Sequence, residues 1–409
     1  MVGDKQLERD IVIIYSNIEL VNGGSAGSAR VMNYARAISK NCNVILLTFI
    51  RRKEIKFESI KEVETGIYTV GIKGKENRFL SKFFYFFYVL SFLFEISKFS
   101  KKFDGRIKSF LLYPSTKILL DILTIIYLIK IKKFNVFYEV NEVRKYSSNL
   151  LYNKDLYSAF KRLLYGFSEK LSGYFTGLLC ISTNIENYFK KYNDKTVRIP
   201  ILSNIKIVPE LRHKKLADND VFKIGFFGSV SYKKENFDLF FRSLLLLRQK
   251  CPDRKFTVAL YGQISSETEE LLPEKLKEYN LEGVIKYFGK IDQNSVLSIM
   301  KNYHLLVLPR GNNLQNKFGF STKLSEYLIS GVPVLVTDVS DNGLYIKDGF
   351  NGFVVPPDNI NALTEKICYI INNYNYFKNI EKNAFDTVKS HFAYNIYSDM
   401  LKDLLCGKE

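Results

Sequence analysis

Residues 305–338 read LLVLPRGNNLQNKFGFSTKLSEYLISGVPVLVTD, and this stretch decides the fold. An apolar run, LLVL, stops at Pro309 and Arg310, and a polar loop rich in Gly and Asn follows. Helical periodicity resumes near Ser321 and breaks at Gly331, after which VPVLVT is a second apolar run. The order strand, loop, helix, strand predicts a parallel βαβ unit.

The start of this helix is expected at the carboxyl end of the sheet, where backbone N–H groups and the helix dipole favour an anion. Ser321 or Thr322 is predicted to cap the helix. Lys323 lies in the first turn, where a cation opposes the dipole, and Glu326 lies one turn later on the same face. Two interpretations follow: a phosphate site whose carboxylate accepts from a diol such as a ribose, or a capped surface helix with exposed charges.

The rest of the chain shows the same alternation of apolar runs and amphipathic helices. Apolar runs begin at Ile11 and again at Phe222, and each opens a series of βα units. With 409 residues the chain can bury two separate cores. This α/β pattern predicts an N-terminal domain over residues 1–203, a polar, lysine-rich linker over 204–220 and a C-terminal domain over 221–389.

The turn after the first strand is rich in glycine, at Gly23, Gly24 and Gly27. Their spacing does not give the GxGxxG pattern of dinucleotide-binding proteins, so no such site is predicted. Taken alone, the turn indicates a tight connection into the next helix.

The strand that opens the second half ends at Gly228, whose missing Cβ would let a phosphate approach the backbone. Lys233 and Lys234 follow in the loop before the next helix. Their charges suit either an anion or a solvated loop.

Charged and polar residues follow the apolar strand within residues 134–144. Glu139, Asn141, Glu142 and Arg144 lie where the carboxyl ends of parallel strands present functional groups. They indicate either a site or a surface cluster of ion pairs.

The chain is strongly basic, with a formal net charge of +18 from 60 Lys and Arg against 42 Asp and Glu. Such a surface attracts anions, so nucleic acid, anionic lipid and a nucleotide-sugar are all compatible partners. No nucleic-acid-binding motif is present in the sequence.

The cysteines and histidines indicate neither a disulfide framework nor a metal site. Five cysteines are widely separated without a CxxC pair, which predicts reduced thiols in a cytoplasmic protein. None of the three histidines lies near other ligands at metal-binding spacing, so we expect no zinc site. The N-terminus, MVGDKQLERD, is charged and has no following signal-type apolar run.

Residues 79–99, FLSKFFYFFYVLSFLFEISKF, are apolar and aromatic but interrupted by Lys82, Glu95 and Lys98. The uninterrupted run is too short to span a bilayer. The segment is therefore either a core helix of the first domain or an interfacial helix whose aromatic face meets lipid while Lys101 and other lysines meet headgroups.

The run GFSTKLSEYLISGVPVLVTD, preceded by LPR, resembles the donor-binding segment of family 4 of the retaining glycosyltransferases. The similarity is greatest to the bacterial branch that reads LPR, loop, GFPTKL, EYLATG, PVVVT. The resemblance implies that Glu326 holds the nucleotide ribose and that basic residues face the diphosphate. It extends to the glycine loop after the first strand, to Gly228 and Lys234, and to residues 348–357.

Three departures from the family pattern concern the expected site. Ser321 replaces the usual proline, which is harmless if the serine caps the helix. Phe318 occupies a position where many members carry a second acidic residue, so backbone groups of Gly319 and Phe320 would have to contact the donor sugar. Ser229 replaces an arginine, whose charge Arg310 could supply. These departures leave open a non-catalytic protein of the same fold that binds a nucleotide-sugar or a lipid.

The resemblance implies a GT-B architecture: two doubly wound, Rossmann-like α/β domains facing across a cleft, with a C-terminal helix at about 390–409 packed back on the first. It implies retaining transfer, without metal or other cofactor, from a nucleotide-sugar donor to a glycan or lipid-linked acceptor, in bacterial surface polysaccharide synthesis. The protein would be cytoplasmic, either free or peripheral on an anionic membrane surface, and would bind no nucleic acid.

The expected site residues fall into three groups. The catalytic group comprises Lys234, Arg310, Glu326 and Glu139. The donor-binding group comprises Gly228, Ser229, Lys233, Gly262, Gly289, Gly319, Phe320, Ser321, Thr322, Lys323 and Leu324. The acceptor group comprises Gly23, Gly24, Gly27, Asn141 and Arg144.

Overall fold

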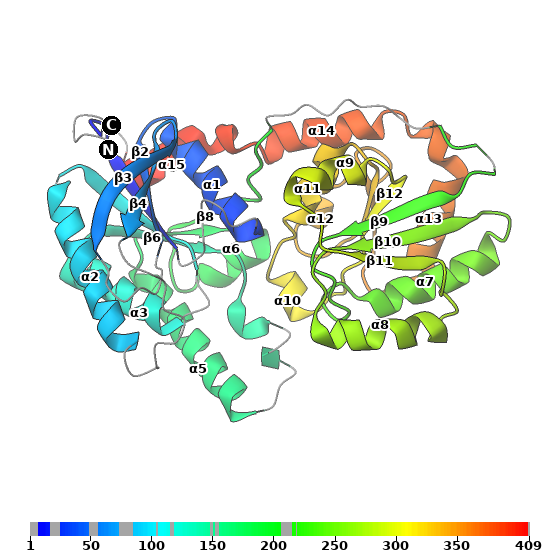
Figure 1. Cartoon of the computed structure of the whole chain (residues 1–409), viewed down its shortest axis with the longest axis horizontal. Helices are drawn as coiled ribbons and strands as arrows, with labels where there is room; N and C mark the ends of the chain where they lie inside the picture. Colours follow the sequence, from blue (N-terminus) through cyan, green and yellow to red (C-terminus); the bar gives the residue numbers. More distant parts are fainter. Residues whose placement is uncertain are drawn as a thin grey trace. The chain divides into compact units, whose positions relative to one another are not determined.

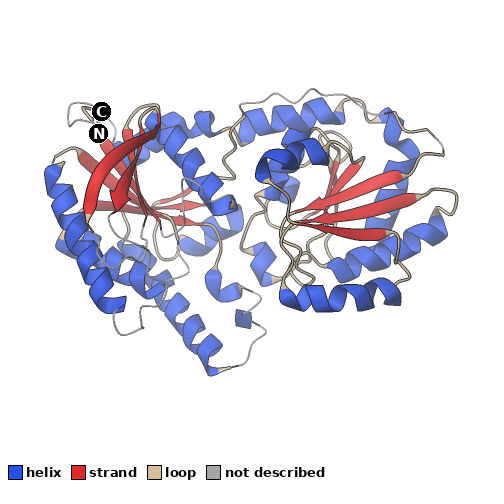
Figure 2. Cartoon of the chain, in the orientation of Figure 1, coloured by secondary structure: helices blue, strands red, loops and turns tan. Residues whose placement is uncertain are grey.

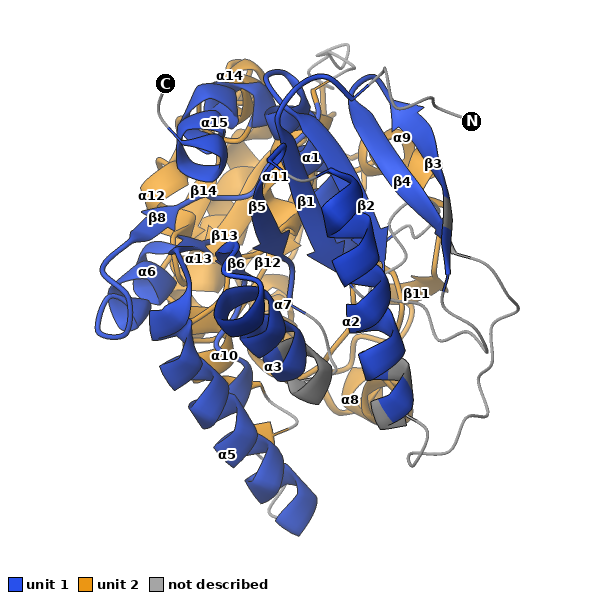
Figure 3. Ribbon diagram, turned by 90° about the vertical axis from the view of Figure 1, so that its left-hand side faces the viewer, with its two compact units in different colours: residues 1–145, 153–204, 393–409 blue, residues 146–152, 205–392 orange. Residues whose placement is uncertain are grey.

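The computed structural model of the chain divides into two compact units (Figures 1 and 3). Unit 1 comprises residues 1–145, 153–204 and 393–409, and unit 2 comprises residues 146–152 and 205–392. The structure describes residues 7–16, 25–48, 56–72, 85–103, 105–114, 118–147, 150–151, 155–205, 215–217 and 219–407. The expected linker, 204–220, lies largely outside these residues.

Unit 1 is built on an eight-stranded sheet in the order β3-β4-β2-β1-β5-β6-β7-β8. All neighbouring strands are parallel except β3 and β4, which form an antiparallel edge. The strands are β1 (Ile11–Ser16), β2 (Asn43–Thr48), β3 (Phe57–Glu64), β4 (Ile67–Ile72), β5 (Ile107–Leu112), β6 (Asn135–Val140), β7 (Gly177–Cys180) and β8 (Thr196–Arg198).

Helices cover both faces of this sheet (Figure 2), as expected for parallel strands joined by helical crossovers. They are α1 (Ala26–Ser39), α2 (Tyr85–Lys102), α3 (Ile118–Ile126) with a π-helical extension η2 (Tyr127–Ile131), α5 (Leu156–Leu171), η4 (Ser172–Tyr174), α6 (Thr183–Phe189), η7 (Tyr394–Tyr397) and α15 (Ser398–Cys406). The short helix η3 (Arg144–Tyr146) begins in unit 1, and its last residue belongs to unit 2.

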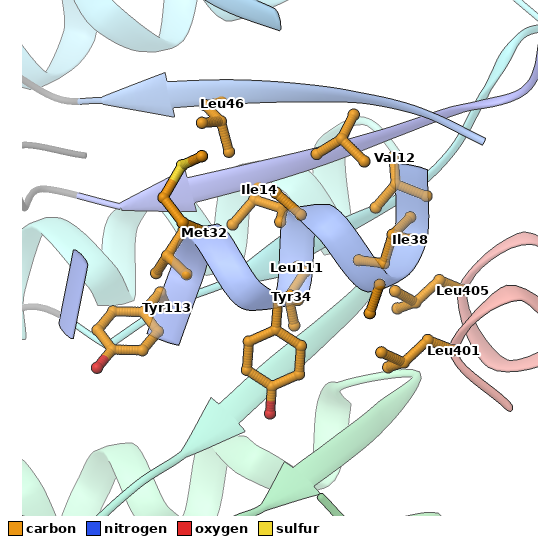
Figure 4. Close-up of a cluster of buried hydrophobic side chains, with 14 of the residues drawn as sticks. Val12, Ile14, Met32, Tyr34, Ile38, Leu46, Leu111, Tyr113, Leu401 and Leu405 are labelled. Atoms are coloured by element: carbon orange, nitrogen blue, oxygen red, sulfur yellow. The ribbon is translucent and has the colours of Figure 1, made fainter. Parts of the chain in front are cut away.

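The C-terminal helix α15 completes a hydrophobic core in unit 1 (Figure 4). Leu401 and Leu405 of α15 pack with Ile38 of α1 and with side chains of β1, β2 and β5. The chain enters this helix beside β8, because the N–H of Tyr394 donates to the carbonyl of Ser203 at 3.0 Å. The last helix therefore contributes to the core that the first strands begin.

Unit 2 contains a six-stranded, entirely parallel sheet in the order β11-β10-β9-β12-β13-β14. The predicted βαβ unit is confirmed, because β12 and β13 pair in parallel with α11 between them. The strands are β9 (Phe222–Phe227), β10 (Phe256–Tyr261), β11 (Ile285–Gly289), β12 (Leu305–Leu308), β13 (Val334–Thr337) and β14 (Phe353–Val355).

The helices of unit 2 also lie on both faces of its sheet (Figure 2). They are α7 (Phe237–Lys250), α8 (Ser266–Glu278), η5 (Gln293–Ser295), α9 (Val296–Met300), α10 (Leu314–Lys317), α11 (Lys323–Ser330), α12 (Asn342–Tyr345), α13 (Ile360–Asn373), η6 (Tyr374–Tyr376) and α14 (Ile380–His391).

The expectation of five reduced cysteines is wrong for one pair. Cys251, at the end of α7, forms a disulfide with Cys368 in α13, across 117 residues of sequence. The two helices pack together, and Thr364 of α13 donates a hydrogen bond to the carbonyl of Ser243 in α7. This packing brings the two Cα atoms to 6.6 Å, a distance that a disulfide spans.

Candidate functional site

The centre of unit 2 is the point where its strand order reverses. The chain leaves β9 toward β10 on one side, and β12 follows on the other side of β9. Ligands of open α/β sheets bind outside the carboxyl ends of the strands at such a point. The loop from Gly228 to Asn236 follows β9, and Arg310 follows β12, so both are held at this edge.

A buried carboxylate, Glu235, gathers three cationic side chains at this edge. The Nε and Nη2 atoms of Arg310 donate to its two oxygens at 3.1 and 3.2 Å, and the Nζ of Lys323 donates at 2.8 Å. Lys234, next in sequence, is close enough to lower the pKa values of both Glu235 and Lys323. Glu235 is fully buried and Arg310 is 7% exposed, so solvent does little to screen these charges.

The protonation of this cluster follows from burial and from its opposed charges. Burial alone would raise the pKa of Glu235, but Arg310 and Lys323 hold it well below its usual range. Burial lowers the pKa of Lys323 to about 8, although Glu235 opposes the change. At neutral pH the cluster therefore holds three cations against one buried anion.

Two glycines make room for Lys323. A Cβ on Gly228 would lie 1.9 Å from Cε of Lys323, so the lysine side chain fills the space beside this glycine. A Cβ on Gly262 would lie 1.9 Å from the carbonyl oxygen of Gly228, and both glycines have positive φ angles. The backbones of the loops after β9 and β10 are therefore in direct contact. The ammonium of Lys323 lies 4.2 Å from the ring centre of Phe226.

Tyr327 fixes α11 against the end of β9. Its hydroxyl accepts from the N–H of Phe227 at 2.7 Å and donates to the carbonyl of the same residue at 3.0 Å. Lys323 is one turn before Tyr327, and Glu326 precedes it directly, so this bracket sets the position of both charged residues. Burial raises the pKa of Glu326, and the charge of Lys323 opposes that rise.

The helix cap predicted at Ser321 or Thr322 is wrong. Thr322 precedes the first residue of α11 with helical backbone angles and makes no capping hydrogen bond through its side chain. The Ser321 hydroxyl is buried and has no hydrogen-bond partner in the described part of the chain. Backbone amides at the start of α11 are therefore not closed off by either hydroxyl.

The other predicted donor-binding residues occupy several environments. Phe320 stacks on Tyr345 and Leu324 is fully buried, so both side chains belong to the core. The carbonyl of Gly319 accepts from Ser340 at 2.5 Å. Gly289, at the end of β11, has open space beside its Cα.

Two residues of the loop after β9, Ser229 and Lys233, are exposed and do not belong to the buried cluster. Lys233 is half exposed and pairs with Glu267 at 2.5 Å, whereas Lys234 lies next to Glu235. Ser229 is exposed. Of the two adjacent lysines, the structure therefore brings Lys234 to the cluster.

The residues predicted in the first half lie in unit 1. Glu139, at the end of β6, is fully buried and forms an ion pair with Arg30 of α1. Burial raises the pKa of Glu139, and Arg30 opposes that rise. Arg30 also donates to the carbonyls of Ile199 and Pro200. This carboxylate therefore links α1 to β6 and does not stand in open solvent.

A pocket in unit 1 borders the same strand end, and Glu139, Asn141 and Arg144 are among the residues that line it. One oxygen of each of Glu139, Asn141 and Glu169 is buried without a hydrogen-bond partner among the described residues. Gly27 lies in the first turn of α1. Gly23 and Gly24 lie outside the described residues.

Sequence reasoning missed Glu235, although it is the residue that organises the cluster. Its partners Arg310 and Lys323 lie 75 and 88 positions away. One local signal was present: a carboxylate stands between Lys234 and the buried Phe237 at the start of an apolar helix. A charge at the edge of a core requires a partner.

Residues 208–387 match the sequence model of the family described as glycosyl transferases group 1. The chain is also similar to a sucrose synthase of Melioribacter roseus, with 27% identity over 147 residues, which cover 34% of this chain and 18% of that protein. The chain spans less than a third of the length of the curated relatives that it matches.

Two solved structures are similar over nearly their full lengths. Sucrose-phosphate synthase from Thermosynechococcus elongatus has a TM-score of 0.69 at 15% identity, over 97% of this chain and 98% of that chain. Anabaena HepE in complex with UDP and glucose has a TM-score of 0.67 at 13% identity, over 98% and 100%. The fold is therefore GT-B, with two parallel-sheet α/β domains, and the group 1 glycosyltransferase match covers most of unit 2.

Proposed function

We propose that the protein transfers a sugar from a nucleotide-sugar donor to a glycan or lipid-linked acceptor. The observation that carries the proposal is the cluster of Lys234, Arg310 and Lys323 around buried Glu235, at the point where the strand order of unit 2 reverses. The group 1 match over residues 208–387 and the UDP-bound structure with the same fold support a nucleotide-sugar as the donor.

The cluster suits a diphosphate leaving group because its charges are already oriented. Glu235 takes two of the five N–H donors of Arg310 and one of the three of Lys323, which leaves donors on each for phosphate oxygens. Because the carboxylate holds both side chains in place, little reorganisation is needed as negative charge develops on the leaving group. Lys234 adds a third cation at the same edge.

We assign Glu326 to the ribose of the donor. It lies one turn into α11 after Lys323, and an ionised carboxylate accepts hydrogen bonds from both hydroxyls of a diol. Burial raises the pKa of Glu326, because water solvates the buried carboxylate poorly. Hydrogen bonds from the two ribose hydroxyls would supply the partners that water does not.

The proposed transfer is retaining and needs no metal. The departing phosphate would take the proton of the acceptor hydroxyl on the same face of the sugar, while the three cations offset the charge of the leaving group. Hexosyl transfer in surface polysaccharide synthesis is proposed from the resemblance of the donor segment to bacterial enzymes. A nuclear magnetic resonance assignment of the anomeric configuration of the product tests retention.

A second candidate is a non-catalytic protein that binds the same donor. It is favoured by Phe318, which lies where many relatives of the donor segment carry an acid and whose ring lies 5.3 Å from that of Tyr146 in the same unit. Release of labelled sugar from the donor to lipid-linked acceptors excludes this candidate. Binding without transfer across the acceptor panel supports it.

A thermal-shift screen against UDP-, GDP-, ADP- and dTDP-sugars tests the donor site. A ligand at about 100 times its Kd should raise the Tm by roughly 5 °C or more, because it binds only the native state. Lys234→Ala and Glu326→Ala should each lose most of this shift and most activity while remaining folded. Lys250→Ala, which removes an exposed lysine that pairs with Glu365, is the matched control. A full shift in both site variants would refute these assignments.

A further inference from the structure

The helix α5 of unit 1 carries its apolar side chains on the outside. Its exposed residues are Leu156, Tyr157, Phe160, Leu163, Phe167 and Lys170. Leu163 is 73% exposed and Phe160 and Phe167 are more than half exposed. The spacing of residues 156, 160, 163 and 167 places them on one face of the helix.

The opposite face of α5 is the one that packs on the protein, and it is partly polar. Ser158 and Glu169 are its buried residues. Glu169 accepts from Lys145 at 2.7 Å and from Tyr188 at 2.9 Å. The helix is therefore fixed to unit 1 through its polar residues, which leaves the apolar stripe facing outward.

Two further helices of unit 1, close to α5, also carry exposed apolar residues. α3 packs against both α2 and α5, and Figure 3 shows the three helices in one unit. On α2, Phe87, Leu90 and Phe94 are exposed at spacings of three and four residues, whereas Phe92 and Ile96 face the core. Ile126 and Ile131, at the ends of α3 and η2, are also exposed. We refer to these residues and the α5 stripe as the α2–α3–α5 face.

Lysines border the α2–α3–α5 face and lie on its aromatic rings. The ammonium groups of Lys98, Lys130 and Lys161 lie 4.3 to 4.5 Å from the ring centres of Phe94, Tyr174 and Tyr157. The exposed lysines on these helices and in the turn after η2 are Lys98, Lys101, Lys102, Lys130, Lys133 and Lys170. Among the described side chains of α2, α3 and α5, no Asp or Glu is exposed, and the one exposed carboxylate beside them in the described residues is the N-cap of α5, Asp155.

We propose that the α2–α3–α5 face binds the surface of an anionic bilayer. Aromatic and aliphatic side chains on one helix face, bordered by lysines, match the layering of acyl chains and anionic headgroups. The excess of exposed lysines over exposed acids on this face favours an anionic lipid surface over a second copy of this basic chain. No helix in the described ranges is long and apolar enough to cross a membrane, so the contact is interfacial. The proposal does not depend on the donor site of unit 2.

The absence of tryptophan from the sequence permits a direct test. Leu163→Trp puts the one tryptophan of the variant on the α5 stripe, with an apolar side chain retained. With vesicles of equal parts phosphatidylglycerol and phosphatidylcholine, its emission should shift to the blue and be quenched by brominated acyl chains. Vesicles of phosphatidylcholine alone should give a much smaller change. Phe350→Trp, at an exposed position of unit 2, should show no shift and is the matched control.

A second variant tests the α5 stripe without an added tryptophan. Replacing Phe160, Leu163 and Phe167 with Asn should leave Tm unchanged, because these side chains are exposed. It should lower vesicle partitioning by at least about tenfold, because each substitution removes one apolar side chain that would be buried in the bilayer. The control triple is Leu344, Phe350 and Tyr376, all exposed in unit 2. Added salt should also weaken binding.

Several results would overturn the proposal. One is unchanged Leu163→Trp emission at saturating anionic vesicles, and another is equal partitioning of the α5 triple and the wild type. A concentration-dependent dimer that the α5 triple abolishes, without vesicle binding by the wild type, would identify a protein interface instead. Nucleotide binding in the thermal-shift screen reports separately on the donor site.

Discussion

Replacing Glu235 with Gln should lower the stability of unit 2 substantially. Glu235 is fully buried and accepts three charge-assisted hydrogen bonds, two from Arg310 and one from Lys323. Gln keeps the shape but leaves two cations without their counter-ion, and breaking a buried ion pair costs about 3–5 kcal/mol. At about 2–4 °C per kcal/mol for a domain of this size, the Tm should fall by roughly 10 °C.

Thermal unfolding followed by circular dichroism measures this loss. The matched control is Glu267→Gln, which breaks the exposed pair with Lys233 and should cost less than about 1 kcal/mol. Adding UDP or pyrophosphate should raise the Tm of Glu235→Gln by more degrees than that of the wild type, because the ligand supplies the missing negative charge. If the Tm of Glu235→Gln is no lower than that of the control, Glu235 does not stabilise unit 2 by neutralising Arg310 and Lys323.

Three further changes have defined outcomes. Burial lowers the pKa of Lys323 to about 8, so the ammonium loses its proton as pH rises through that value and UDP affinity should fall. Calorimetric titrations measure this change. Arginine stays charged, so Lys323→Arg should remove the pH dependence. Gly228→Ala places a Cβ 1.9 Å from the Lys323 side chain and should lower the free energy of unfolding by about 2 kcal/mol. In the control, Gly166→Ala, the new Cβ meets nothing within 4 Å and should not destabilise the protein. Equal Tm values for the two variants would contradict this difference. Reducing the Cys251–Cys368 disulfide, which spans 117 residues, should lower stability by on the order of 4 kcal/mol, and a Tm insensitive to dithiothreitol would argue against the bond.

The sequence predicted those features whose causes are local. The apolar run before Pro309, the helical period after it and the break at Gly331 lie within 34 residues, so β12, α11 and β13 could be predicted together with their parallel pairing. Periodicity and chain breakers act over a few residues, which is why these elements needed no tertiary information.

Features that depend on distant partners could not be predicted. The disulfide partner of Cys251 is 117 positions away, without any spacing motif to indicate it. The apolar stripe of α5 faces outward because Lys145 and Tyr188, 24 and 19 positions from Glu169, bind this carboxylate and hold the polar face inward. Lys323 suggested an anion at the helix start, and the structure supplies one from the protein itself in Glu235. Only the packed chain brings these groups together.

The return of α15 to unit 1 has a consequence for synthesis on the ribosome. Leu401 and Leu405 belong to the core that Val12 and Ile14 begin, so this core cannot be complete until residue 405 has been translated. The sheet of unit 2, by contrast, is complete once Val355 has emerged. The sheet of unit 2 can thus be complete before the core of unit 1 is, although its strands are made later.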